Sequence, residues 1–228
     1  SPSLKSKVVS FELQIKSWEH NLSQAMELGP RHISAYELTP EANTPLHDAL
    51  KAKELVMPPE EAIAEMYYRG VEILGINGYS HYEISNFAKY GFECRHNLNY
   101  WGRGQYIGVG AGAHSFTGAV RYSNTTNIRE YVEKLRVDNM PVDECDAITD
   151  IEAYKEIIFL GLRKAAGIKL DNLPKNLRSA IKKAADDKAI VGLLSYDNNS
   201  IYLTRKGLIL SNEVISRLLL YIENYRPV

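Results

Sequence analysis

Residues 17–38 read SWEHNLSQAMELGPRHISAYEL, a helical pattern that passes directly into a strand pattern. Trp18 and Leu22 lie about one helical turn apart, and Gly29-Pro30 is a typical helix end. The segment HISAYEL, residues 32–38, is apolar enough for a strand buried in a parallel sheet. A helix followed by a buried strand indicates an α/β fold, in which chemistry is expected in the loops beyond the carboxyl ends of the strands.

The chain beyond this stretch repeats the alternation and then loses it. Pro58-Pro59 precede an amphipathic helix that Asn77-Gly78 ends, and YSHYEIS, residues 79–85, predicts a second strand. From residue 86 to residue 123 the sequence predicts a long loop rich in glycine and aromatic residues, with a hairpin around Thr117-Gly118. A loop of this length inside a compact domain is usually functional.

The last part of the chain predicts a winged-helix-like module. A helix is expected over 127–138, and the acidic linker PVDECDA after it suggests a domain boundary. Thr149 and Glu152 form a capping box for an amphipathic helix that runs through Leu162. Beyond it the pattern predicts, in chain order, a helix at 175–188, strands at 191–196 and 201–203, and a last helix from Thr204.

The helix at 175–188 decides whether such a module could bind DNA, because the helix before the wing often does so. Asp186 and Asp187 offset two of its positive charges, and the sequence gives no separate basic arm. Nucleic acid binding is therefore disfavoured, and the alternative is a packing or lid role. The basic residues of this helix are Lys175, Arg178, Lys182, Lys183 and Lys188.

Composition excludes several other classes of protein. The chain has 228 residues, 45% of them hydrophobic and 24% charged, and its formal net charge is -1. The near-zero balance gives no general attraction to nucleic acid or anionic membranes. No run approaches about 18 consecutive apolar residues and the first residues lack the apolar core of a signal peptide, so we expect a cytoplasmic protein without a membrane span. Cys94 and Cys145 are the only cysteines, too few for an iron-sulfur cluster held by this chain alone.

RHNLNYW, residues 95–101, combines polar groups with large flat rings. A neutral imidazole at His96 can ligate iron, Tyr100 and Trp101 can cover an extended π-system, and the flanking arginines can meet carboxylates. A porphyrin provides all three partners, namely a bound iron, an extended π-system and carboxylates. The alternative is that the polar residues satisfy buried backbone groups while the rings fill the core.

GVGAGAHS, residues 108–115, has three glycines in five positions, which lets the backbone approach a ligand closely. The segment lacks the GxGxxG spacing of a dinucleotide site. His114 follows the small residues and would lie close to any ligand that the glycines allow to approach the backbone. The alternative is a tight crossing of two backbones.

Read together, HISAYELTPEANTPL, GYSHYEISNFA, RHNLNYW and YIGVGAGAHS resemble the C-terminal portion of the radical S-adenosylmethionine family of oxygen-independent coproporphyrinogen III oxidase-like proteins. Within that family the HNxxYW motif most resembles the heme chaperone (HemW) branch. The resemblance runs from about Ser17 to the C-terminus. It implies the end of an incomplete (β/α) barrel over 1–57, an α+β domain over 58–145 with the HNxxYW and GVGAGAHS segments, and a winged-helix-like helical module over 146–228.

Family members hold a four-iron four-sulfur cluster on an N-terminal CxxxCxxC motif, at which S-adenosylmethionine is cleaved. This chain has no such motif, so the resemblance implies that it is not catalytic alone. By the match, the S-adenosylmethionine side of the cavity would be lined by Tyr36, Glu37, Thr39, Gly110, Ala111 and His114. Heme or a porphyrin would be bound, with His96 as the axial ligand of the heme iron, by Arg95, His96, Asn97, Tyr100, Trp101 and Arg103.

One segment departs from the family pattern. Where members have a strand ending in aspartate and a GLPGQT-like turn, this chain reads LKSKVVSFELQIKSW. The departure indicates either a divergent N-terminus or a truncation junction, and no residue before Tyr36 is assigned to the S-adenosylmethionine site.

Two classes of function follow. The first is a fragment of a protein of heme and porphyrin metabolism, which passes heme to a hemoprotein acceptor as a chaperone or, as an oxidase, helps convert porphyrinogen propionates to vinyl groups. The second is a winged-helix module that binds nucleic acid or a protein partner.

Overall fold

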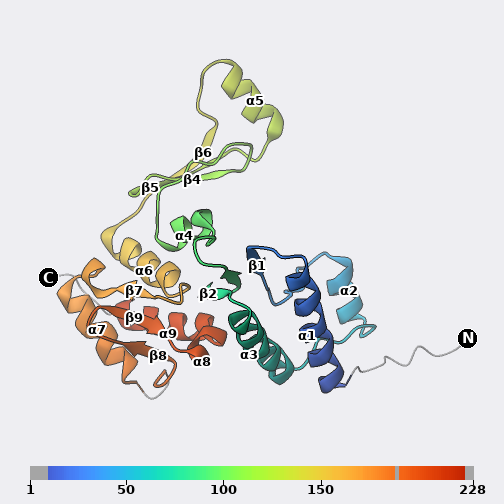
Figure 1. Ribbon diagram of the computed structural model, residues 1–228. Helices are drawn as coiled ribbons and strands as arrows, with labels where there is room; N and C mark the ends of the chain where they lie inside the picture. Colours follow the sequence, from blue (N-terminus) through green and yellow to red (C-terminus); the bar gives the residue numbers. More distant parts are fainter. Residues whose placement is uncertain (1–9, 188–189, 224–228) are drawn as a thin grey trace, which may run out of the picture. The chain divides into compact units, whose positions relative to one another are not determined.

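The computed structural model describes residues 10–187 and 190–223. The chain divides into two compact units, Ser1–Glu93 and Cys94–Val228, and each combines helices with small sheets (Figure 1). The mixed α/β class predicted from the sequence is therefore confirmed. The three-part division at residues 57 and 145 stays a prediction.

The first unit is built on two helices, α1 (Phe11–Glu27) and α3 (Glu60–Ile76), which pack against each other. Ser10 caps α1 through its side chain, which accepts a hydrogen bond from the Leu13 amide. The helix predicted at 17–28 is confirmed, with additional turns before it. Buried Leu22 and Leu74 join these two helices in one core with residues of the sheet. In chain order the elements are α1 (Phe11–Glu27), β1 (His32–Ser34), α2 (Pro45–Lys51), α3 (Glu60–Ile76), β2 (Ser80–Glu83) and β3 (Asn86–Ala88).

The sheet of the first unit is antiparallel, with strand order β1-β3-β2. The strand predicted at 32–38 is confirmed over His32–Ser34, but the parallel sheet predicted for it is wrong. Ile33 and Ala35 pack against the hydrophobic core, whereas Ser34 between them is exposed. This alternation is typical of an antiparallel strand with one buried face, since a strand of a parallel sheet is covered on both faces.

The second unit begins with α4 and a three-stranded antiparallel sheet, β4-β5-β6. The hairpin at Thr117-Gly118 is confirmed, because β4 and β5 pair on either side of it. The predicted loop over 86–123 is wrong, since it contains β3, α4 and β4. The predicted linker PVDECDA is also wrong, because Val142–Ala147 is a strand paired with β5. These elements are α4 (Arg95–Trp101), β4 (His114–Phe116), β5 (Val120–Asn124), α5 (Ile128–Arg136) and β6 (Val142–Ala147).

The rest of the second unit surrounds another antiparallel sheet, in the order β7-β9-β8. The Thr149 and Glu152 capping box at the start of α6 is confirmed. The predicted helix at 175–188 ends at Ala185, and Lys188 lies outside the described residues. In chain order the elements are α6 (Asp150–Gly161), β7 (Ile168–Lys169), the 3-10 helix η1 (Leu170–Asn172), α7 (Lys175–Ala185), β8 (Leu194–Tyr196), β9 (Ser200–Leu203), α8 (Arg205–Ile209) and α9 (Ser211–Glu223).

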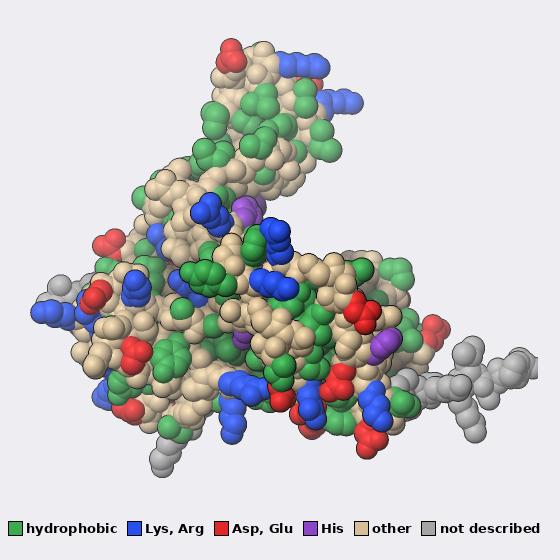
Figure 2. Space-filling model, viewed as in Figure 1, with side chains coloured by type: hydrophobic (Ala, Val, Ile, Leu, Met, Phe, Trp, Pro, Cys, Tyr) green, Lys and Arg blue, Asp and Glu red, His purple; other side chains and the backbone are tan. Residues whose placement is uncertain are grey.

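All three sheets are open, so the described residues contain no barrel. Within residues 10–187 and 190–223, no helix is both long enough and apolar enough to cross a membrane. Figure 2 shows hydrophobic side chains on the surface of the lobe that contains α5, where Ile128, Val132 and Leu135 are exposed.

Candidate functional site

The RHNLNYW segment forms a short helix, α4, and not the irregular loop that the sequence predicts. His96 and Tyr100 lie four residues apart and therefore share a face of this helix. The Tyr100 ring meets the imidazole edge to face, with ring centroids 4.7 Å apart. His96 is exposed, so its ring is accessible to a ligand.

A series of aromatic rings runs inward from His96. Tyr100 contacts Tyr106 at 4.7 Å between centroids, and Tyr106 lies 6.1 Å from Phe116. Tyr106 and Phe116 also exchange two backbone hydrogen bonds, of 2.9 and 2.8 Å. Because Phe116 is buried at 2% exposure, the series anchors the surface histidine to the interior of the second unit.

Arg103, assigned by resemblance to the ligand's carboxylates, already has a carboxylate of its own chain. Its Nε donates to Glu156 at 2.6 Å, and one terminal nitrogen donates to the Gly118 carbonyl at 3.0 Å. Arg121 binds the other oxygen of Glu156 at 2.9 Å, and this contact raises the pKa of Arg121. Both guanidinium groups also lie over the Phe116 ring. Arg103 therefore ties α4 and the β4-β5 hairpin to α6.

The remaining residues of the motif differ in environment. Arg95 is exposed, and Asn97 is half-buried. Trp101 packs its ring under the Arg163 guanidinium, whose central carbon lies 5.5 Å from the ring centroid. The indole Nε1 of Trp101 is buried, with no hydrogen-bond partner among the described residues. A buried donor without an acceptor is uncommon in folded proteins, so this nitrogen is an unsatisfied polar group within the described residues.

The glycine segment folds back on its own backbone. Asn124, buried on β5, donates to the Gly108 and Gly110 carbonyls at 3.4 and 2.9 Å. Gly108 N donates to the buried Ser115 hydroxyl at 2.9 Å, and a Cβ at Gly108 would collide with the His114 carbonyl oxygen. These contacts match the tight backbone crossing that the sequence left open. His114 itself is exposed on β4, and Ala111 is half-buried.

Tyr36, Glu37 and Thr39 lie in the first unit, where all three are exposed. The amide of Asn86 donates to the Tyr36 hydroxyl at 3.4 Å. Glu83, in register with Asn86, is buried at 2% exposure, and its Oε1 has no partner among the described residues. The polar face of this sheet therefore has hydrogen-bonding capacity that its own unit does not fill.

No group of three or more His, Cys, Asp or Glu side chains that could hold a metal ion occurs in the part of the chain that the structure describes. Heme would not need such a group, because the porphyrin supplies four nitrogen ligands to the iron and one imidazole from the protein can be enough to hold it. His96 suits that role, since it is exposed and its imidazole has no hydrogen-bond partner among the described residues.

Comparison with known proteins shows what the chain as a whole is similar to. Residues 148–210 match the family described as the HemN C-terminal domain. The heme chaperone HemW of Bacillus subtilis is 35% identical over 209 residues, which cover 90% of this chain and 55% of that protein. The HemW of Lactococcus lactis is 31% identical, over a match that covers 88% of this chain and 53% of that protein. Residues 148–210 are therefore similar to the HemN C-terminal domain, and most of this chain is similar to HemW.

The chain spans about half the length of these HemW relatives. A solved structure, described as coproporphyrinogen III oxidase (HemN) from Escherichia coli, a radical SAM enzyme, superposes with a TM-score of 0.65 at 17% identity. The match covers 93% of this chain and 52% of that one. At this identity the superposition shows that the chain shares the HemN fold.

Three residues that shape the candidate site were not found from the sequence. Tyr106 continues the aromatic series, and Asn124 holds the glycine segment. Glu156 joins two arginines. Asn124 and Glu156 lie in a strand and a helix without any local motif, so only the fold reveals their partners. Tyr106 could have been found as the first residue of the quoted segment YIGVGAGAHS, two residues before Gly108.

Proposed function

We propose that this chain is the heme- or porphyrin-binding part of a HemW-type radical SAM protein, with His96 as the axial ligand of the iron. The observation that supports the proposal is the exposed His96 imidazole at the outer end of the aromatic series, within the HNxxYW motif. Tyr100 orients the ring, and buried Phe116 anchors the series.

The side chains near His96 would make the other contacts with the ligand. Arg95 is exposed and can meet a propionate carboxylate, whereas Arg103 is engaged by Glu156 and serves mainly to position α4. Trp101 and Tyr100 provide ring surface, and Asn97 provides an amide. Heme, when bound, supplies the iron that His96 ligates. In the chaperone form of this function the heme would pass to a hemoprotein acceptor.

Radical chemistry would belong to the whole protein. The assignment of Tyr36, Glu37 and Thr39 to S-adenosylmethionine binding rests on the resemblance alone and stays a proposal, as does the separate assignment of Gly110, Ala111 and His114. The chain contains no CxxxCxxC motif, so cleavage of S-adenosylmethionine at a four-iron four-sulfur cluster would need residues that this sequence does not contain. A cytoplasmic location is proposed with this function.

Heme titration of the chain tests the proposal. We expect a Soret band shift that saturates with heme, and at least about tenfold weaker binding for His96→Ala because the iron-imidazole bond is lost. His20→Ala, which removes an exposed imidazole from α1, is the matched control and should bind like the parent. Equal affinity of His96→Ala and His20→Ala would reject His96 as the ligand.

A second candidate function is a winged-helix module. The element order α6-β7-η1-α7-β8-β9 and the sheet order β7-β9-β8 favour it. On α7, however, Arg178 pairs with Asp171 at 3.1 Å and Lys182 lies over the Tyr196 ring. These contacts favour a packing role or a protein partner over DNA. A salt-dependent DNA shift that is lost on neutralising Lys182 and Lys183 would support nucleic acid binding.

A further inference from the structure

A pocket of about 660 Å³ lies in the second unit between α6 and the β7-η1 segment. Ligand pockets typically have volumes of about 300–1,000 Å³, so this pocket could hold a small organic molecule. Its lining comes from α6, the turn that follows α6, and the β7-η1 segment, with contributions from the end of α4 and from Ser200.

The charged side chains that line the pocket are all cationic. They are Arg103, Lys164 and Lys169, and no Asp or Glu is among the lining residues. Arg103 shares the Glu156 carboxylate with Arg121, but neither lysine has an ion pair among the described residues. Asp171 of η1, which lies in the sequence between the lining residues Lys169 and Asn172, pairs with Arg178. The pocket therefore carries two positive charges without carboxylate partners.

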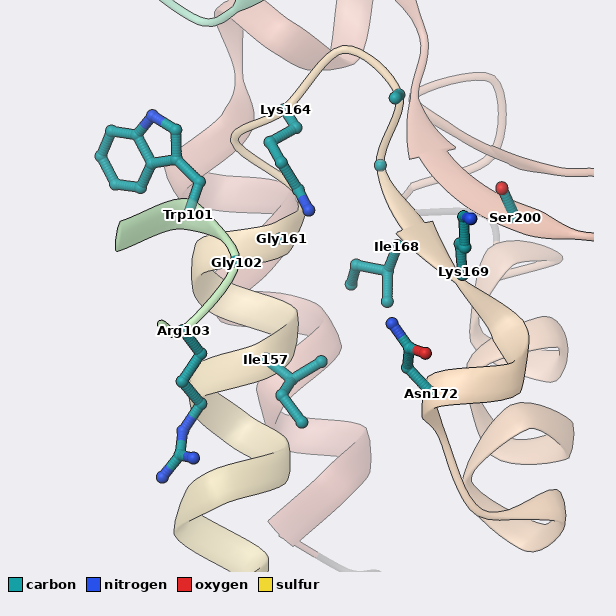
Figure 3. Close-up of a pocket in the computed structure, with 12 residues that line it drawn as sticks. Trp101, Gly102, Arg103, Ile157, Gly161, Lys164, Ile168, Lys169, Asn172 and Ser200 are labelled. Carbon is teal, nitrogen blue, oxygen red and sulfur yellow. The ribbon is translucent and has the colours of Figure 1, made fainter. Parts of the chain in front are cut away.

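Figure 3 shows how the side chains are directed. The Lys164 amine points into the space between α6 and β7, and Ile157 and Ile168 point into it from opposite sides. The Asn172 amide reaches the same space from η1. Trp101 and Arg103 point away from it. The interior of the pocket therefore combines one cation and one amide with two apolar walls.

The side-chain amine of Lys164 is partly buried and therefore loses part of its contact with water. Its backbone is fixed by two hydrogen bonds. Lys164 N donates to the Gly161 carbonyl, and Gly167 N donates to the Lys164 carbonyl. Burial lowers the pKa of the Lys164 amine, and no hydrogen bond within the described residues compensates the buried charge. An anion placed beside this amine would restore the lost interactions.

We propose that this pocket binds an organic carboxylate, whose acidic group contacts Lys164 Nζ and the Asn172 amide while its apolar body lies between Ile157 and Ile168. The apolar walls favour an organic acid over an inorganic anion, because a bare phosphate would leave both isoleucines without contacts. The proposal does not depend on heme binding at His96.

NMR titration of the whole chain with sodium benzoate tests this assignment. We expect saturable shifts at the amides of Lys164, Ile168 and Asn172. Lys164→Met should weaken benzoate binding about tenfold or more, because it removes a charge-assisted hydrogen bond and keeps the aliphatic chain. Lys164→Arg, which keeps the charge, should retain binding. Lys183→Met on the exposed side of α7 is the matched control and should bind like the parent.

Three results would overturn the assignment. They are equal benzoate affinity of Lys164→Met and Lys183→Met, equal affinity of the uncharged isostere benzyl alcohol, and tighter binding of inorganic phosphate than of benzoate. Thermal unfolding of each variant establishes that it is folded. Heme titration of Lys164→Met then identifies the source of the carboxylate, since weakened heme binding indicates a heme propionate and unchanged binding indicates a separate organic acid. His96→Ala tests the iron ligand independently of either result.

Discussion

Replacing Glu156 with Gln should destabilise the second unit, because one carboxylate serves two arginines there. Arg103 and Arg121 lie 2.6 and 2.9 Å from its two oxygens, and both guanidinium groups lie over the buried Phe116 ring. The substitution keeps the shape of the side chain and removes its charge. Two cations then remain side by side without a counterion.

The degree of burial sets the size of the effect. The side chains of Arg103 and Glu156 are 13% and 21% exposed, and that of Arg121 is 38% exposed. Removing one partner of a buried pair costs about 3–5 kcal/mol, whereas an exposed pair contributes about 0–1 kcal/mol. For this partly buried cluster we expect a loss of about 2 kcal/mol in the free energy of unfolding.

Urea unfolding followed by Trp101 fluorescence in a Trp18→Phe background measures this loss in the unit that contains Glu156. Glu213→Gln is the matched control, because Glu213 pairs with Arg217 at 2.9 Å on an exposed helix face. That substitution should cost about 0.5 kcal/mol or less. A loss for Glu156→Gln no larger than that of the control would refute the reasoning that the cluster joins α4 and the β4-β5 hairpin to α6.

Three further predictions concern His81, Gly108 and Gly75. Burial lowers the pKa of His81 below its ordinary value of about 6.5, so the folded state favours the neutral ring and stability should fall as the pH drops below that value. His81→Gln should flatten this dependence, measured as the urea midpoint by Trp18 fluorescence, and an unchanged slope would contradict the assignment. Gly108→Ala should destabilise the second unit by about 2 kcal/mol or more because its Cβ would meet the His114 carbonyl. Gly75→Ala on α3, where an added Cβ has no atom within 4 Å, should stabilise the first unit by about 0.5–1 kcal/mol. If both glycine substitutions changed the free energy of unfolding in the same direction, the result would be inconsistent with this packing.

The sequence predicted the features that depend on neighbouring residues. The capping box of Thr149 and Glu152, the helix end at Gly29-Pro30 and the hairpin at Thr117-Gly118 each form within a few residues of the chain. Their physical causes are local hydrogen bonds and local backbone preferences, so the sequence contains them. The motif that led to the HemN and HemW relatives is likewise a short segment.

The features that were predicted wrongly depend on partners far along the chain. PVDECDA was interpreted as a linker because it is acidic, but Tyr122 and Cys145 pair across β5 and β6 and leave its charges exposed. Arg103 was expected at a ligand carboxylate, and its partner Glu156 lies 53 residues away. Neither contact has a local signal. For α4, a helix of seven residues rich in asparagine, local propensity gave the wrong answer.

The absorption spectrum of the heme-loaded chain tests the central claim most directly. If His96 ligates the iron, His96→Ala should change the Soret maximum and the visible bands at saturating heme, and added imidazole should restore them. His20→Ala, which removes an exposed histidine of the first unit, should leave the spectrum unchanged. A spectrum of His96→Ala identical to that of the parent chain would contradict the account.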